Sequence, residues 1–362
     1  MRYQSFDSTR FSDFLPDHAT LEKSYLGLKT YQCPSISFRR VSTAFRNFQK
    51  SIRSAITPSE YKIFCVTSKE ISLDLTKRLQ EFEQEIYYSY SDQCFKIEHG
   101  KGNAKGYCGF FDMLSESNSV YFYIAQCKKD KKITKIVKGE ERVFFRKKGE
   151  IAAVGCCVLR TLKTHNGNPI KAWYVCDLKV GENHRGEHLP TALIKKGAWR
   201  ILQCKRGFGV CMDELDGKMS KSARISVQRS FFSGLLETTH FNQYKLSAQQ
   251  VQDHYKVIQE KFCENRLMKK EYLSFVSNKG LKDYQVMNRK TGESKPMKLL
   301  HAKPSFKEQN MPQKGYNHVF STVKGSSLDT ALQKIATPSL TGRFVSFGMK
   351  EIDFNQITSA EI

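Results

Sequence analysis

VCDLKVGENHRGEHLPTALI, residues 175–194, is the stretch that decides the fold of this chain. Apolar and polar side chains alternate up to Val180, as in a half-buried strand, and from Leu189 onward the apolar side chains follow helical spacing. Pro190 suits the first turn of a helix, where its missing N–H would have had no partner. We therefore expect a strand, a glycine-containing loop, and a helix that begins near Leu189.

The neighbouring segments extend this unit on both sides. IAAVGCCVLRTLK (151–163) and PIKAWYVCDLKV (169–180) are apolar runs separated by five residues that contain Asn166-Gly167. Both of these residues tolerate positive φ, so the two runs are predicted to form an antiparallel hairpin. GFGVCMD (207–213) reads as a further strand, which the crossover helix would make parallel to the second run.

The remaining pattern predicts a mixed α/β chain. Strands are expected at Tyr61–Thr67, at Ser119–Cys127 and in several short runs between Tyr272 and His301. Amphipathic helices are expected at Ser72–Tyr90, about Ala223–Leu236 and about Ala248–Arg266. The glycine-rich segment His99–Gly106 is interpreted as a surface loop, because it lacks the spacing of a dinucleotide-binding motif.

Clusters of turn-forming residues and changes in composition divide the chain into three predicted segments. Residues 1–57 are rich in Ser, Arg and aromatic side chains with weak periodicity, and are interpreted as an N-terminal extension. The ordered pattern occupies 58–302. Residues 303–362 are turn-rich, with a short helical candidate at Ser327–Ile335, and are interpreted as a C-terminal extension.

The charge of the chain limits its partners. The 362 residues include 59 Lys and Arg against 36 Asp and Glu, a formal net charge of +23. Such a surface favours polyanions such as nucleotides, nucleic acid or anionic lipid. The cations are spread along the chain with local clusters at Lys128–Lys132 and Arg146–Lys148, so a generic basic surface and a dedicated nucleic-acid face both remain open.

Cysteine usage indicates a reducing compartment. The chain has eleven cysteines and no CxxC pair, which argues against a disulfide framework or a zinc knuckle. The first residues lack the apolar core of a signal peptide, and no stretch approaches a membrane span. A cytoplasmic location is therefore expected. The long basic extensions also resemble those of bacterial proteins delivered into host cells.

The order of elements and the sequence at 175–194 resemble the GNAT N-acyltransferase superfamily. The acyl-CoA motif of that family is a strand ending in an apolar pair, a loop of the type Q/R-x-x-G-x-G/A, and a helix. Leu178 and Val180 supply the pair, and Asn183–His188 occupies the loop. The chain departs from the motif at Asn183, where Gln or Arg is usual, and at His188, where a second Gly or Ala is usual. The resemblance implies an α/β (α+β) fold with a mixed, mostly antiparallel central sheet and flanking helices.

The resemblance also implies a site for acetyl-CoA or another acyl-CoA, without a metal. The backbone of Leu178, Lys179 and Val180 would hydrogen-bond to the pantetheine arm. Backbone N–H groups and the positive end of the helix dipole would hold the pyrophosphate. The residues implied there are Arg185, Gly186, Glu187, His188, Leu189, Pro190 and Thr191.

For catalysis, the family pattern points to Asp177 or a bound water as the base that deprotonates the acceptor amine. An equally open interpretation is a strand aspartate paired with a neighbouring Lys or Arg. Phe231 and Phe232 stand near the position of the tyrosine that usually protonates the leaving thiolate, which leaves Tyr244 as a distant substitute.

Two other motif matches are weaker. His184-Arg185-Gly186-Glu187-His188 matches the HxxEH zinc motif, but that motif needs a continuous helix, in which Gly186 would cost about 1 kcal/mol and Pro190 about 3 kcal/mol. KMSKS (218–222) matches a loop of class I aminoacyl-tRNA synthetases, but the chain has no HxGH motif. In an acyl-CoA-binding domain, Lys218 and Lys221 would contact a phosphate or an acidic acceptor, or they would lie in a solvated turn.

Taken together, the sequence predicts a CoA-dependent N-acyltransferase, most simply an acetyltransferase, acting on an amine of a protein or small molecule. Two alternatives share the fold. One is a binding or adaptor protein for nucleic acid or another polyanion without acetyl transfer, and the other is an aminoacyl-tRNA-dependent transferase.

Overall fold

The computed structural model describes most of the chain from residue 60 onward, within one compact unit spanning 48–362. The described residues are 60–90, 93–99, 109–115, 119–137, 139–214, 216–220, 224, 236–264, 272–277, 282–288, 291, 293–305 and 310–362. The expected N-terminal extension, most of the glycine-rich loop and nearly all of the helix expected at 223–236 lie outside these residues.

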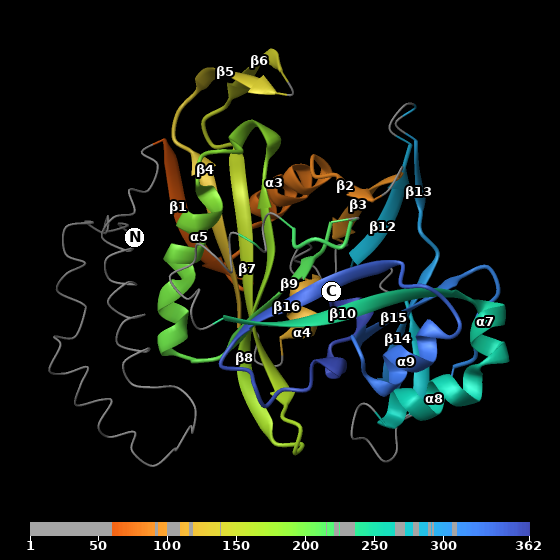
Figure 1. Ribbon diagram of the computed structural model, residues 1–362. Coiled ribbons are helices and arrows are strands. Elements are labelled where there is room, and N and C mark those ends of the chain that lie inside the picture. The colour runs from red at the N-terminus through yellow and green to blue at the C-terminus, as the bar shows by residue number, and fades with distance from the viewer. Residues whose placement is uncertain are drawn as a thin grey trace, which may run out of the picture. The chain divides into compact units, whose positions relative to one another are not determined.

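A ten-stranded sheet runs through the described part of the chain (Figure 1). Only the pairs β8–β9 and β14–β15 are parallel, and the other neighbours are antiparallel. The expected fold class, a mixed and mostly antiparallel sheet with flanking helices, is confirmed. In spatial order the strands are β1 (Tyr61–Thr67), β4 (Val120–Cys127), β7 (Ile151–Lys163), β8 (Pro169–Val180), β9 (Gly207–Met212), β16 (Leu340–Phe347), β10 (Leu236–Ser247), β15 (Asn317–Val323), β14 (Leu299–Ser305) and β11 (Tyr272–Val276).

Both faces of the first half of the sheet are buried. On β4, for example, Phe122 and Ile124 belong to one core, and Tyr123 and Ala125 belong to another, because successive side chains point to opposite faces. Helices α3 (Leu73–Gln84) and α4 (Gly109–Leu114) contribute to the first core, and α5 (Leu189–Gly197) contributes to the second. The 3₁₀ helix η4 (Ala198–Leu202) continues α5.

Helix α3 is shorter than the sequence predicts. Its first turn is capped by the Ser72 hydroxyl, which accepts a hydrogen bond from the Leu75 N–H, and Leu79 and Phe82 are buried as expected. The helix ends at Gln84, and Tyr88–Tyr90 at the end of the expected helix form strand β2 instead.

The hairpin predicted for 151–180 is confirmed. Lys163 of β7 pairs with Pro169 of β8, and the Thr164 N–H donates to the carbonyl of Asn168 across the turn. Gly167 has a φ of +81°, a conformation that glycine adopts without strain. The parallel pairing of β8 with β9 through a helical crossover is also confirmed.

The second half of the sheet has its own core, formed with helices α7 (Ala248–Asp253), α8 (Tyr255–Glu264) and α9 (Ser327–Gln333). The helices expected near 248–266 and 327–335 are thus present, the first as two helices. Strand β16 lies between β9 and β10, so residues 303–362 supply a central strand of the same sheet. The expected boundary at residue 302 therefore follows no division in the sheet.

Two smaller sheets complete the described residues. One orders β13 (Ser294–Pro296), β12 (Lys282–Met287), β3 (Gln93–His99) and β2. The other is a hairpin of β5 (Lys131–Val137) and β6 (Glu140–Arg146), which the sequence did not lead us to expect. Short 3₁₀ helices η6 (Phe354–Gln356) and η7 (Ser359–Glu361) follow β16. No helix in the described part of the chain is long and apolar enough to cross a membrane.

Candidate functional site

Strands β8 and β9 separate where the candidate site begins. They pair only from Trp173–Gly207 to Val175–Gly209, although β8 continues to Val180 and β9 to Met212. Asp177 has a φ of +56°, and the ladder between β7 and β8 shifts register at this point. Such a bulge bends its strand, so the end of β8 leaves its parallel neighbour. Within the described part of the chain, the backbone of Leu178, Lys179 and Val180, which the resemblance assigns to the pantetheine arm, is therefore unpaired on its β9 side.

The loop after β8 leads into α5 as the sequence predicts. A 3₁₀ turn, η3 (Glu182–His184), is followed by Gly186 with a φ of +89° and by His188 with a φ of +56°. The helix begins at Leu189, with Pro190 in its first turn. The N–H groups of a first helical turn have no acceptor within the helix, so those of Leu189 and Thr191 are directed toward the loop side. This strand, loop and helix have the arrangement that the resemblance to the GNAT superfamily implies.

The zinc alternative requires His184 and His188 on one helical face, and the structure separates them. His184 is buried in the 3₁₀ turn, whereas His188 is exposed at the N-cap of α5. The continuous helix that the zinc motif requires is therefore not formed, and the segment containing Gly186 is a loop that ends where α5 begins at Leu189. The interpretation of this segment as a loop followed by a helix is confirmed.

His184 instead joins a small group of side chains beneath the loop. Its Nε2 lies 2.9 Å from Glu150 Oε1, and its Nδ1 lies 3.2 Å from the Tyr61 hydroxyl. The Cys127 thiol lies nearby, and the potential metal-ligating atoms of Cys127, Glu150 and His184 are all within 4.8 Å of one another. Both ring nitrogens of His184 have hydrogen-bond partners. The group is therefore a buried polar cluster whose histidine is satisfied by protein side chains.

The β5–β6 hairpin holds the carbonyl side of the loop. Arg146 Nη2 donates to the Asn183 carbonyl at 2.8 Å and to Glu187 Oε1 at 2.7 Å. Lys135 Nζ donates to the Arg185 carbonyl at 2.7 Å. Burial alone would raise the pKa of Glu187, but the hydrogen bond and charge of Arg146, with Lys135, outweigh it and lower this pKa.

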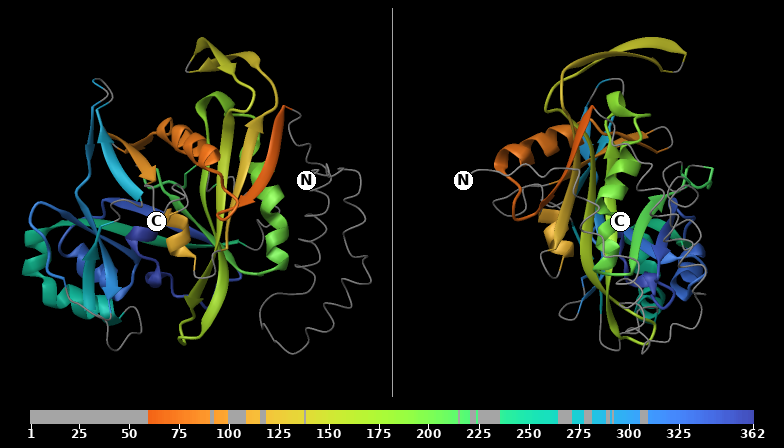
Figure 2. Two further views of the ribbon diagram at one scale, coloured as in Figure 1. Left: turned by 180° about the vertical axis from the view of Figure 1, so that it is seen from behind. Right: turned by 90° about the vertical axis from the view of Figure 1, so that its left-hand side faces the viewer.

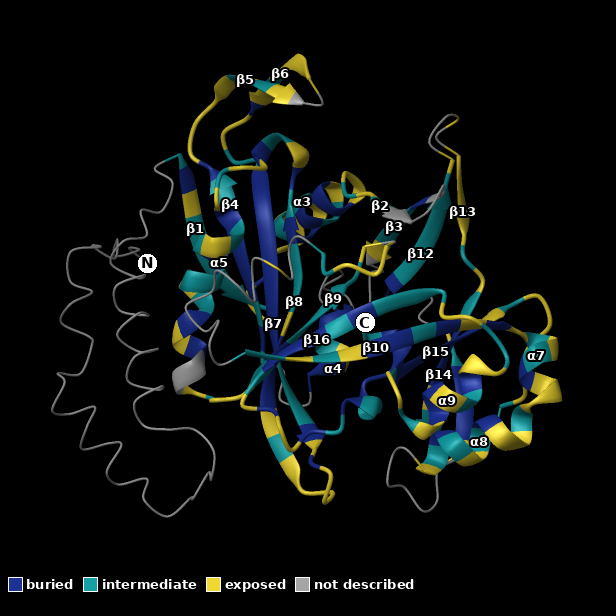
Figure 3. Ribbon diagram, in the orientation of Figure 1, coloured by how far each residue is buried: buried dark blue, intermediate teal, exposed yellow. Residues whose placement is uncertain are grey.

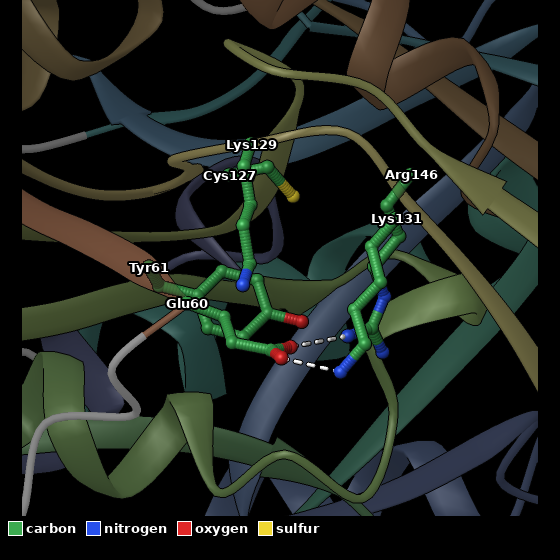
Figure 4. Close-up of a pocket in the computed structure, with 6 residues that line it drawn as sticks. All are labelled: Glu60, Tyr61, Cys127, Lys129, Lys131 and Arg146. Carbon is green, nitrogen blue, oxygen red and sulfur yellow. Dashed lines mark hydrogen bonds and ion pairs between the residues drawn. The ribbon is translucent and has the colours of Figure 1, made fainter.

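The base of the hairpin is anchored on β1 (Figure 4). The guanidinium of Arg146, whose side chain is 2% exposed, lies 5.6 Å from the centre of the Tyr61 ring and 3.4 Å from Glu60 Oε2. Lys131 forms a second ion pair with Glu60. Arg146 therefore connects β1, β6 and the loop before α5.

The residues expected to hold pyrophosphate divide into two groups. Glu187 is engaged by the hairpin. Arg185 and Gly186 are exposed, and a Cβ added at Gly186 would meet nothing within 4 Å. Within the described residues, no hydrogen bond or ion pair engages the guanidinium of Arg185. The exposed side of the loop thus carries the guanidinium of Arg185, which is available to bind an anion.

The expected catalytic residue, Asp177, lies in a buried ionic cluster. Asp177 Oδ1 is 2.5 Å from Lys179 Nζ, and this ammonium also contacts both carboxylate oxygens of Glu83 on α3, at 2.5 and 2.6 Å. The three side chains are 8%, 7% and 3% exposed respectively. The interpretation of Asp177 as a strand aspartate paired with a lysine is what the structure shows, and the side chain of Lys179 points into this cluster.

The cluster perturbs its members. Burial raises the pKa of Glu83 to about 7, with a contribution from the charge of Asp177 and against the effect of Lys179. Burial lowers the pKa of Lys179, but Asp177, Tyr88 and Glu83 together raise it above its ordinary value. Two carboxylates around one ammonium leave an excess negative charge in a dry environment, which is why one of them retains a proton more readily.

The residues considered for the thiolate acid are not brought to this site. Phe231 and Phe232 lie outside the described residues. Tyr244 is buried in the second core, where its hydroxyl donates to Asp329 Oδ1 at 2.7 Å. The KMSKS lysine Lys218 is 78% exposed and pairs with Asp216 in a turn, as a solvated turn would place it; Lys221 lies outside the described residues.

Sequence comparisons identify no relative: no protein-family model and no curated protein matches the chain. Among solved structures, the chain is similar to Saccharomyces cerevisiae N-myristoyltransferase with bound myristoyl-CoA, at 11% identity and a TM-score of 0.38, over 91% of this chain and 93% of that one. It is also similar to a GCN5-related N-acetyltransferase from Anabaena variabilis, at 10% identity and a TM-score of 0.36, over 79% and 72%.

Proposed function

We propose that the chain is a CoA-dependent N-acyltransferase, which moves an acyl group, most simply acetyl, from an acyl-CoA to an amine of a protein or small molecule. The observation that carries the proposal is the separation of β8 from β9 directly before a glycine loop and a helix N-terminus. The end of β8 stays paired with β7 but has no neighbour among the described residues on its β9 side, so its backbone groups on that side are offered to an extended amide-containing arm. The helix start and the side chain of Arg185 offer positive charge to a pyrophosphate.

The chemistry assigned to the chain's own residues is proton transfer and positioning. The amine nitrogen forms the new C–N bond, the C–S bond of the thioester breaks, and the amine proton passes to Asp177. Because this carboxylate is largely buried, a water molecule carries the proton to it. The CoA thiolate takes its proton from solvent.

Calorimetry with acetyl-CoA tests the binding step. We expect saturable heat with the full chain, and weaker binding for Arg185→Ala, since this substitution removes a charge-assisted hydrogen bond to phosphate. Lys334→Ala is the matched control, because it removes an exposed cation at the end of α9, in the second half of the sheet. Neither heat nor a thermal shift at millimolar acetyl-CoA, myristoyl-CoA and free CoA would overturn the proposal.

The positive charge supports a second candidate, a GNAT-fold binding protein for nucleic acid that transfers no acyl group. The net charge of +23 is the observation that favours it. Binding to RNA or DNA that weakens steeply with salt, without acyl-CoA binding, would support this candidate. Aminoacyl transfer from charged tRNA in the absence of CoA would instead support the aminoacyl-tRNA-dependent alternative.

A further inference from the structure

The β5–β6 hairpin has one face engaged and one face open. Alternation along the paired strands places Lys135 and Arg146 on the face that holds the loop before α5. The opposite face carries Ile136, Val143 and Phe145, which are 79%, 47% and 66% exposed. The hairpin extends beyond the large sheet in each view, and it is mostly exposed (Figures 2 and 3). Three large apolar side chains thus share one exposed face of a two-stranded ribbon.

A basic region surrounds this apolar face. Residues 128–148 contain ten Lys and Arg against three Asp and Glu, a net charge of +7. An open hollow of about 790 Å³ lies at the base of the hairpin between Phe145, Lys132 and the exposed Lys147 and Lys148. Asp130 also lines it, and its carboxylate accepts a hydrogen bond from the Lys148 N–H at 2.6 Å. Among the described residues, no ion pair engages the ammonium groups of Lys147 and Lys148. The hollow is therefore suited to phosphate groups.

Exposed apolar residues within a basic surface have a specific chemical preference. Apolar patches rimmed by polar residues mark interaction sites, and an uncovered hydrophobic ribbon favours aggregation unless it has a partner. Single-stranded nucleic acid would use aromatic platforms for stacking, and it would leave the aliphatic Ile136 and Val143 in water. A bilayer surface takes up aliphatic and aromatic side chains at its interface while its anionic headgroups attract lysines.

We propose that the open face of the β5–β6 hairpin docks on an anionic phospholipid bilayer. Ile136, Val143 and Phe145 enter the boundary between headgroups and acyl chains, and the lysines at the base of the hairpin contact lipid phosphates. The opposite face of the same ribbon holds the loop before α5, so docking places that loop close to the membrane surface. The proposal is independent of acyl transfer, because its readout needs no acyl-CoA.

Co-sedimentation of the full chain with vesicles tests the proposal. We expect binding to phosphatidylcholine vesicles that contain phosphatidylserine and little binding to pure phosphatidylcholine. The triple variant Ile136→Ser, Val143→Ser, Phe145→Ser is expected to weaken binding roughly tenfold or more, because it removes the inserting side chains. The charge reversals Lys147→Glu and Lys148→Glu together are expected to do the same.

Matched controls use similar side chains elsewhere. Val257 on α8 is 50% exposed, so Val257→Ser controls for the loss of an exposed apolar residue, and Lys314→Glu with Lys334→Glu controls for charge. Thermal melts check that every variant is folded. Binding that is equal in the hairpin variants and the controls would overturn the proposal. So would a failure to bind anionic vesicles, including the case in which single-stranded RNA binds instead.

Discussion

The ammonium of Lys179 lies 2.5 Å from the carboxylate of Asp177, two residues earlier on the same strand. The bulge at Asp177 has two effects. It turns the end of β8 away from β9, and it places the Asp177 carboxylate in the buried ionic cluster. Glu83 on α3 completes the cluster from the other side.

Lys179→Met should destabilise the protein severely. The substitution leaves Asp177 and Glu83 as two buried carboxylates without the ammonium between them, which typically costs about 3–5 kcal/mol. Urea unfolding followed by circular dichroism measures the change. Lys218→Met, at an exposed turn, should change the free energy of unfolding by no more than about 0.5 kcal/mol. Similar midpoints for the two variants would refute a structural role for the cluster.

Glu83→Gln should change how stability depends on pH. The pKa of Glu83 is raised from its ordinary 4.5 to about 7 in the folded chain, so folding binds a proton between these values. The contribution of Glu83 to stability is therefore greatest below pH 4.5 and is lost as the pH rises through about 7. The melting temperature of the glutamine variant should rise relative to wild type between pH 5 and pH 8. A constant difference across this range would contradict the raised pKa.

Gly186 and His188 provide a pair of substitutions with opposite expected signs. Both residues have positive φ, at +89° and +56°. Gly186→Ala should destabilise by about 1 kcal/mol through backbone strain alone, since a Cβ there meets no neighbour. His188→Gly should relieve strain and stabilise by up to about 1 kcal/mol. Chemical denaturation measures both, and the same sign for the two variants would contradict the loop geometry.

Arg146→Ala should loosen the loop before α5. The buried guanidinium holds the Asn183 carbonyl and Glu187, so its removal leaves these acceptors with only the longer contacts from Lys135 Nζ, at 3.2 and 3.5 Å. Hydrogen exchange of the peptide covering residues 182–188 should become about tenfold faster or more. Arg142→Ala, on the same strand but 50% exposed, is the control and should leave that exchange unchanged. If acyl-CoA binds as proposed, only the Arg146 variant should weaken it.

The parts of the site that depend on local sequence were predictable. Pro190 and Gly186 act on their own segment, so the end of the loop and the start of α5 at Leu189 followed from backbone chemistry alone. The hairpin of β7 and β8 was predictable for the same reason, because Asn166-Gly167 defines its turn.

The parts that depend on distant partners were not predictable. Glu83 is four residues after Leu79 on the apolar face of α3, so its burial could be predicted from the sequence. Its partners Asp177 and Lys179 could not, because they lie on a distant strand. The β5–β6 hairpin escaped prediction because its lysines obscure the alternation of a strand. Strands β10, β15 and β16 were missed because their stability comes from pairing with one another.

Strand β16 has a consequence for how the chain assembles. It fills the space between β9 and β10, although more than ninety residues separate it from β10 along the chain. Until β16 is in place, β9 and β10 both have unpaired edges, and unpaired edges recruit other strands. Pairings between residues so distant in sequence form slowly. Gly342 of β16 lies against the ring of Phe241 on β10, and an added Cβ would be 2.5 Å from that ring. Position 342 must therefore be glycine for β16 to pair with β10 in this register.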